Sequence, residues 1–150
     1  MRVVIQKAIK ASVSANNKVT GVIDQGLMVL VGVEDLDTQD DADWLANKIV
    51  NMRLFADENE VNNLSVKDVN GGILVVSQFT LHASTKKGNR PSYMRAGKPD
   101  HAKSMYEYLV KKLSEFLEKE IPTGVFGEMM EVSLVNLGPM TMVMDSKNKE

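Results

Sequence analysis

The amino-acid sequence predicts an α+β fold, in which a mixed or antiparallel β-sheet, partly closed like a barrel, carries two main helices. Apolar segments rich in β-branched residues lie near both ends and in the middle of the chain. Two segments between them repeat apolar residues at helical spacing. This order of strands, helix, strand, helix and strands is typical of helices packed on one sheet or on a partly closed barrel. A chain of 150 residues suits a single domain, residues 1–150.

The N-terminal part predicts a β-hairpin followed by a central strand. Residues 1–15 alternate apolar and polar side chains with one slip, the Asn16-Asn17 pair signals a turn, and residues 19–23 form the returning strand. Residues 27–33 are a continuous apolar run, which suits a strand buried on both faces. Such a strand needs cover on its second face, and a dimer interface is one way to supply it.

A first helix is predicted from Thr38 to about Leu54. The Thr38 side chain can cap the free backbone N–H groups, and the acidic residues that follow suit the positive end of the helix dipole. Residues 62–72 are rich in Asn and Gly and indicate loops.

The second half of the chain is predicted to contain the longest helix between strands. Its helix begins with Pro99, a favoured first helical residue, and ends before a Pro- and Gly-containing stretch. The expected segments are a strand over 73–81 with a polar end, a basic loop over 85–97, a helix over 100–120, a stop at 121–124, and strands over 128–135 and 140–144.

The composition excludes several classes of protein. Hydrophobic residues make up 43% and charged residues 25% of the chain, which is ordinary for a globular protein. The absence of cysteine excludes disulfides, thiolate metal sites and a cysteine nucleophile. Polar residues interrupt the first fifteen positions, and no apolar stretch approaches the ~18 residues of a membrane span. We therefore expect a cytoplasmic enzyme or binding module without membrane association.

The charge is unevenly distributed although the net charge is only −2. Residues 69–99 contain no Asp or Glu. A basic stripe on an acidic body can hold a polyanion such as a nucleic-acid backbone. A solvated lysine-rich loop is the alternative. The basic residues in this stretch are Lys86, Lys87, Arg90, Arg95 and Lys98.

Familiar catalytic constellations are missing from the sequence. The two histidines, His82 and His101, lack the spacing of a metal site, and the chain has neither a phosphate-binding glycine loop nor a GxSxG motif. His101 is expected to be exposed near a helix start. His82 follows the polar strand end and is a candidate for contact with a ligand. We therefore predict that no metal or other cofactor is needed.

Two polar clusters remain as candidate sites. Ser77-Gln78-Phe79-Thr80 ends a buried strand, where each unsatisfied polar group costs ~1–3 kcal/mol. These groups either satisfy neighbouring backbone or donate hydrogen bonds to an oxyanion formed in acyl transfer. In the second cluster, residues 136–141, Gly138-Pro139 is either a simple turn or a cis peptide. The cis form would present two carbonyl acceptors to an ammonium group.

These clusters resemble the SQxT and NxGPxT motifs of the D-aminoacyl-tRNA deacylases, also called D-tyrosyl-tRNA deacylases. Leu137 stands where many members have an acidic residue, and Met140 where Val is common. We expect the turn to survive these changes and the polarity of the pocket rim to differ. The similarity covers nearly the whole chain, in residues 1–6, 11–13, 26–33, 86–92, 123–127 and 145–146.

The resemblance implies a homodimer with two active sites at its interface and no other obligatory protein partner. Gly138-Pro139, as a cis pair, would reach into the partner's site, face the α-amino group of the substrate and leave no room for an L side chain. Asn136 and Thr141 belong to the same substrate-binding motif. Achiral glycine would also pass, so glycyl-tRNA mischarged on alanine tRNA is an expected second substrate.

The resemblance further implies that Ser77, Gln78, Phe79 and Thr80 form the catalytic segment. Gln78 and the N–H groups around Phe79 and Thr80 would stabilise the oxyanion, while water and the ribose 2′-hydroxyl provide the proton chemistry. Thr80 as a covalent nucleophile is the alternative, but it needs a base that is not visible nearby. The basic residues between Lys86 and Lys98 would contact the acceptor stem of tRNA.

Two other functions compete with this interpretation. A related editing domain could act on L-aminoacyl-tRNA, although the freestanding length and the intact Gly138-Pro139 pair argue against it. A non-enzymatic nucleic-acid-binding module is the second alternative. Relatives linked to DNA binding carry long basic tails, whereas this sequence ends at Glu150 without one.

Overall fold

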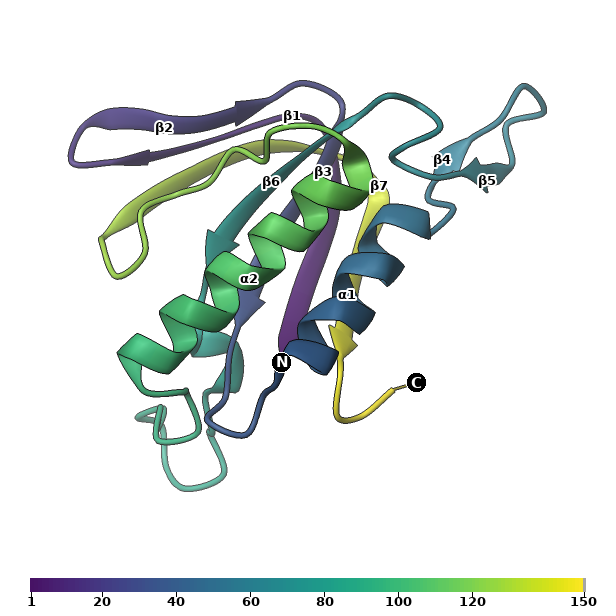
Figure 1. Cartoon of the computed structure of the whole chain (residues 1–150). Coiled ribbons are helices and arrows are strands. Elements are labelled where there is room, and N and C mark those ends of the chain that lie inside the picture. The colour runs from purple at the N-terminus through teal and green to yellow at the C-terminus, as the bar shows by residue number, and fades with distance from the viewer. Residues whose placement is uncertain (150) are drawn as a thin grey trace.

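The structure is a computed structural model that describes residues 1–149, without the side chain of Pro139. It consists of one main sheet, a small two-stranded sheet and two α-helices (Figure 1). The elements are β1 (Arg2–Ala15), β2 (Lys18–Ile23), β3 (Gly26–Gly32), α1 (Gln39–Asn51), β4 (Phe55–Ala56), β5 (Asn62–Leu64), β6 (Gly72–Ser77), a 3-10 turn (Phe79–His82), α2 (Pro99–Leu117) and β7 (Met130–Asp145).

The main sheet is built around the long strand β1. Along one edge β1 pairs antiparallel with β7 over its whole length. Along the other edge its first half pairs with β3 and its second half with β2, both antiparallel, while β6 runs parallel to β3. The sheet curls until β2 touches β6: a Cβ on Gly21 would lie 2.8 Å from Leu74 Cδ1. The predicted mixed, partly closed sheet is therefore confirmed.

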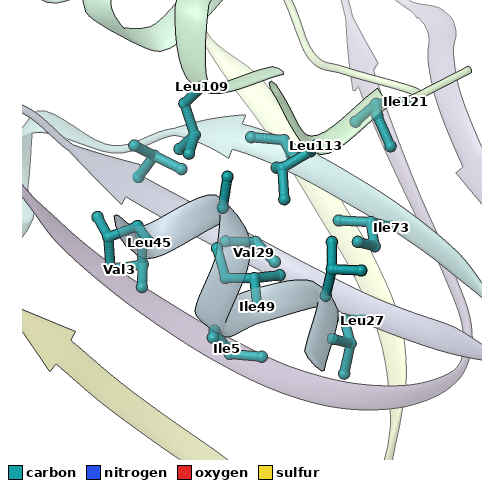
Figure 2. Close-up of a cluster of buried hydrophobic side chains, with 14 of the residues drawn as sticks. Val3, Ile5, Leu27, Val29, Leu45, Ile49, Ile73, Leu109, Leu113 and Ile121 are labelled. Atoms are coloured by element: carbon teal, nitrogen blue, oxygen red, sulfur yellow. The ribbon is translucent and has the colours of Figure 1, made fainter. Parts of the chain in front are cut away.

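Both helices cover the same face of this sheet (Figure 1). Alternate side chains of β1, β3 and β6 point toward the helices, and apolar side chains of α1 and α2 fill the space between them (Figure 2). Burial of this apolar surface is the main contribution to stability. The central side chains are Val3, Ile5, Leu27, Val29, Leu45, Ile49, Ile73, Leu109, Leu113 and Ile121.

The second face of β3 and β6 is also buried, as the sequence predicts. Met28, Leu74 and Val76 pack there against the curled end of β1, against β2 and against β7. Leu74 is 0% and Val76 1% exposed in the single chain. The chain's own curled strands therefore supply this cover, for which a dimer interface was one possible source.

The helix boundaries differ slightly from the predicted ones. At the start of α1 the carboxylate of Asp41 accepts hydrogen bonds from the backbone N–H (2.8 Å) and the hydroxyl (3.2 Å) of Thr38. The helix ends at Asn51 because Met52 is extended. Helix α2 ends at Leu117 because Glu118 adopts a left-handed conformation with φ of 58°. None of the helices in residues 1–149 is long and apolar enough to cross a lipid bilayer.

Two strand predictions need larger corrections. The strand expected over 73–81 ends at Ser77, and the chain then enters the 3-10 turn. The strands expected over 128–135 and 140–144 are one strand, β7, because both parts pair with β1 in the same direction. A turn would reverse the chain, so residues 137–140 form a bulge instead. The short β4–β5 pair within the predicted loops was not expected.

Candidate active site

A cavity of about 630 Å³ lies where the parallel strands β3 and β6 end and α2 begins. Its walls come from four separate segments of the chain: the end of β3, the end of β6 with the 3-10 turn, the start of α2 with the residues just before it, and the start of β7 with the residues just before it. Most of the lining side chains are apolar. They are Val31, Val33, Val76, Ser77, Gln78, Phe79, Thr80, Ala96, Gly97, Pro99, Ala102, Tyr106, Phe126, Gly127, Glu128, Met129, Met130 and Val132.

All four residues of the predicted catalytic segment line this cavity. The N–H of Gln78 donates to the carbonyl of Val31 (2.7 Å), the last bond that ties the segment to β3. The 3-10 turn then starts at Phe79, and its first N–H groups, on Phe79 and Thr80, have no acceptor within the turn. The side-chain amide of Gln78 donates a hydrogen bond to the hydroxyl of Thr80. The segment thus combines backbone donors that the turn itself does not use with two hydrogen-bonded polar side chains.

The opposite wall is aromatic and was not predicted from the sequence. Tyr106 of α2 and Phe126 lie with ring centroids 5.7 Å apart. The Tyr106 hydroxyl donates to the carbonyl of Val75 (2.9 Å), and burial raises the pKa of this hydroxyl, so it stays neutral. Helical periodicity marks Tyr106 only as an inward-facing residue. Phe126 lies in the segment 123–127 that resembles the deacylases, which was the one signal for this wall.

A third wall is the segment between the 3-10 turn and α2, which is fixed at both of its ends. Ser84 and Ser92 exchange two backbone hydrogen bonds of 2.8 and 2.9 Å, and Gly97 N–H donates to the carbonyl of Val33 (2.8 Å). Arg95 forms an ion pair with Glu34, with Nη2 to Oε1 at 2.8 Å. These contacts hold Ala96 and Gly97 against the cavity.

The five basic residues predicted to bind tRNA fall into two groups. Lys86, Lys87 and Arg90 are exposed in the part of the loop closed by the Ser84–Ser92 bridge, which extends below the sheet in Figure 1. Arg95 and Lys98 lie near the anchored end, and the guanidinium of Arg95 is already paired with Glu34. The sequence could not reveal this pairing, because the partners lie far apart along the chain.

The histidines do not behave as the sequence suggests. His82 is completely buried and lies outside the cavity lining, so it is not a contact for a ligand in this cavity. Its Nδ1 is 3.5 Å from Glu34 Oε1. Gly32 makes room for the ring, because a Cβ there would lie 2.9 Å from His82 Cδ2. His101, expected to be exposed, is partly buried.

No strong base accompanies Thr80 within residues 1–149. The lining contains no histidine, and Glu128 is the one carboxylate along it. In the same part of the chain, no group of three or more His, Asp or Glu side chains could hold a metal ion. The arrangement offers hydrogen-bond donors and an apolar enclosure, which suit stabilisation of an oxyanion.

The second predicted cluster forms the bulge of β7. Ala8 pairs with Asn136 and Gln6 with Thr141, so residues 137–140 stand opposite Lys7 alone. The amide of Asn136 donates to the carbonyls of Lys7 (2.8 Å) and Met140 (3.1 Å) and closes the bulge.

The bulge accepts only glycine at position 138 and lies away from the cavity. A Cβ on Gly138 would stand 1.9 Å from the backbone nitrogen of Met140. Strand β7 occupies the edge of β1 opposite β3 and β6, and no residue of the bulge lines the cavity of the same chain. The structure therefore separates the two clusters. The side chain of Pro139 lies outside the described residues, and the cis form of the Gly138-Pro139 pair stays a prediction.

Comparison with known proteins places this architecture in one family. The sequence matches the family described as D-Tyr-tRNA(Tyr) deacylase over residues 4–145. It is 61% identical to a D-aminoacyl-tRNA deacylase of Flavobacterium johnsoniae and 57% identical to one of Phocaeicola vulgatus, with 100% of both chains covered in each case.

Two solved structures resemble the fold. A c-Myc DNA unwinding element binding protein superimposes with a TM-score of 0.89 at 34% identity, over 97% of this chain and 98% of that one. A probable eukaryotic D-amino acid tRNA deacylase gives a TM-score of 0.82 at 16% identity, over 95% of this chain and 97% of that one, and shares the fold. The chain belongs to the D-Tyr-tRNA(Tyr) deacylase family of hydrolases.

Proposed function

We propose that this protein hydrolyses the ester bond of D-aminoacyl-tRNA and releases the free D-amino acid and tRNA. Family membership over residues 4–145 supports the proposal, together with a cavity lined by all four residues of the 77–80 segment. The bacterial relatives suggest the cytoplasm as its place of action, where aminoacyl-tRNA is used. Removal of D-amino acids there is a proofreading step for translation.

Incubation of the purified protein with D-tyrosyl-tRNA and L-tyrosyl-tRNA tests this function. We expect release of D-tyrosine and no release of L-tyrosine above the spontaneous rate. Hydrolysis of L-tyrosyl-tRNA in preference to D-tyrosyl-tRNA would favour the alternative of an editing domain for L-aminoacyl-tRNA. No hydrolysis of either would contradict the deacylase function.

The proposed mechanism uses neutral donors and the substrate's own hydroxyl. The carbonyl oxygen of the ester becomes an oxyanion, which the Gln78 amide and the N–H groups of Phe79 and Thr80 stabilise. Water attacks the carbonyl carbon, and the bond from this carbon to the ribose oxygen breaks. The neighbouring ribose 2′-hydroxyl passes the proton lost by the water to the departing ribose oxygen. The absence of a histidine from the lining agrees with this scheme, as does the use of the Thr80 hydroxyl as acceptor for Gln78.

The proposed selection of the D configuration comes from a second subunit. In a homodimer, the bulge with Gly138-Pro139 would enter the partner's cavity, and its carbonyls would face the α-amino group. Asn136 and Thr141 would hold the bulge in shape. The position of the bulge on the far edge of β1 supports a contribution in trans rather than in cis.

This arrangement would reject L residues by exclusion instead of recognising a side chain, so many D-amino acids would be accepted. Glycine has no side chain to exclude. Glycyl-tRNA, including glycine mischarged on alanine tRNA, is therefore a proposed second substrate.

The basic loop is the proposed contact for tRNA. Lys86, Lys87 and Arg90 have exposed side chains that can neutralise phosphates of the acceptor stem. Arg95 and Lys98 stand closer to the cavity, and the pairing of Arg95 with Glu34 makes it part of the wall as well.

A nucleic-acid-binding function without hydrolysis is the second candidate. It is favoured by the 34% identical structure of a c-Myc DNA unwinding element binding protein. Tight binding of DNA or tRNA without any release of amino acid from D-aminoacyl-tRNA would support this candidate against the deacylase.

A further inference from the structure

Two aromatic rings lie exposed beside the cavity, and one of them has no role in the mechanism above. Phe79 lines the cavity and is 57% exposed, and Tyr93 is 42% exposed. Their ring centroids are 5.2 Å apart, with an angle of 74° between the ring planes. Tyr93 thus lies beside the cavity wall through its contact with Phe79, and both residues are partly open to solvent.

We propose that Tyr93 forms a stacking subsite for the unpaired nucleobase that precedes the terminal adenosine of tRNA. The inference rests on the proposed function and assigns a further part of the same substrate. The acceptor end of tRNA is a single strand. Proteins bind such strands by combining aromatic rings, on which bases stack, with basic side chains along the backbone.

The backbone around Tyr93 is held in place before any ligand binds. The Ser84–Ser92 bridge fixes the residue before it, and Ala96 N–H donates to the Tyr93 carbonyl (3.0 Å). Directly after this turn, the N–H of Gly97 donates a hydrogen bond to the carbonyl of Val33. A backbone that is already fixed loses less conformational freedom when a base stacks on the ring that it carries.

The loop that carries Tyr93 bears basic side chains that suit a polyanionic strand, while Glu34 and Asp35 contact the far end of this segment at Arg95 and Lys98. The stretch from residue 69 to residue 99 contains no carboxylate side chain, and Lys86, Lys87 and Arg90 are exposed on the same loop. Tyr93 contacts Phe79, which lines the cavity, and lies on the loop that carries the basic side chains. A strand that enters the cavity with its 3′ end and follows this loop would meet both the ring and the basic side chains.

The test compares substrates that differ by one nucleotide. The substrates are D-tyrosine esterified to adenosine, to the dinucleotide CpA, and to a dinucleotide with an abasic ribose in place of cytidine. In the wild-type protein, kcat/KM for the CpA ester should exceed that for the adenosine ester by about tenfold, the size expected for one stacked base. The abasic ester keeps the phosphate and should behave like the adenosine ester.

Tyr93→Ala should reduce the ratio of kcat/KM for the CpA ester to kcat/KM for the adenosine ester to about one. Tyr93→Phe should leave this ratio at its wild-type value. Met94→Ala is the matched control, because Met94 is the next residue, is 94% exposed and is absent from the cavity lining. An unchanged ratio in Tyr93→Ala would overturn the subsite while leaving the deacylase function intact.

Two further outcomes would also overturn the inference. If Tyr93→Ala changes the oligomeric mass of the protein in solution and lowers the activity on both esters equally, the ring packs against a second copy of the chain. If the wild-type protein hydrolyses neither the adenosine ester nor D-tyrosyl-tRNA, the proposed function itself fails.

Discussion

At the residue scale, the chemistry of the cavity depends on polar groups at the point where β6 ends. Gln78 gives its backbone N–H to Val31 and its side-chain amide to Thr80, so both of its donor groups are oriented by neighbours. A donor that is oriented before the substrate arrives stabilises developing charge without further reorganisation. We therefore propose that the Thr80 hydroxyl supports Gln78 and does not attack the substrate.

Replacement of Thr80 tests whether its hydroxyl attacks the substrate. We expect Thr80→Ala to retain most of the activity, with a loss of no more than about tenfold from the missing hydrogen bond to Gln78. The measurement is the single-turnover rate on D-tyrosyl-tRNA, with circular dichroism to verify the fold. Complete inactivation of a folded variant would instead assign Thr80 as the nucleophile.

At the scale of elements, the ends of α1 and β7 are joined by a contact remote from the cavity. Lys147, just after β7, donates to the carboxylate of Asp41 in the first turn of α1 (2.7 Å). Burial alone raises the pKa of Asp41, but hydrogen bonds from Lys147 and from the Thr38 N–H outweigh it and hold the pKa well below its ordinary value of 3.8. The carboxylate is therefore charged in the folded state even in acid.

This low pKa makes stability depend on pH in a defined direction. Because the unfolded chain binds the proton more readily, the contact stabilises the fold above pH 3.8 and its contribution is lost as pH falls below that value. Asp41→Asn should lower the free energy of unfolding at pH 7 by about 1–2 kcal/mol, since Lys147 is partly exposed. The difference in free energy of unfolding between wild type and Asp41→Asn should shrink by about 1 kcal/mol between pH 5 and pH 3.

Urea unfolding at the three pH values measures this effect. Asp40→Asn is the control, because Asp40 is an exposed carboxylate in the same helical turn. A gap between Asp41→Asn and wild type that stays constant with pH would show that the Asp41 contact does not depend on the charge of its carboxylate.

At the scale of the whole molecule, one chain is enough to complete the core but not to bring the two sequence clusters together. The curled sheet buries both faces of β3 and β6 without help. The 77–80 segment and the β7 bulge, however, remain on different parts of the sheet. In a symmetric dimer, each chain would place its bulge at the cavity of the other chain. The two-fold axis would therefore create two complete sites.

Mixing two inactive variants tests this arrangement. Gly138→Ala should distort the bulge, because the added Cβ falls on the backbone of Met140, and Gln78→Ala should remove an oxyanion donor. Each variant alone should be nearly inactive on D-tyrosyl-tRNA. After unfolding and refolding together, about a quarter of the wild-type activity should return, since random pairing gives half heterodimers with one intact site each. If no activity returns although heterodimers form, the site does not combine residues of two chains.

Local patterns were sufficient for the elements whose identity depends on neighbouring residues. The apolar run of β3, the hairpin of β1 and β2, and the helical faces of α1 and α2 were predicted close to their observed bounds. The end of β6 and the continuity of β7 were not, because hydrogen bonds to strands distant in the sequence decide them. The cavity walls at Tyr106 and Met129 were missed for a related reason: an apolar side chain at a regular spacing looks the same whether it fills a core or lines a cavity.

The sequence by itself determined the α+β class, the two motifs with their residue types, and the family to which they belong, since all of these are recorded in the order of the amino acids. Only the tertiary structure decided that residues 77–80 meet α2 and residues 126–130 around one cavity, that Arg95 is held by Glu34, and that the bulge stands across β1 from that cavity. The physical reason is that strand pairing and the curl of the sheet arise from contacts between segments far apart in the chain, which no local pattern encodes.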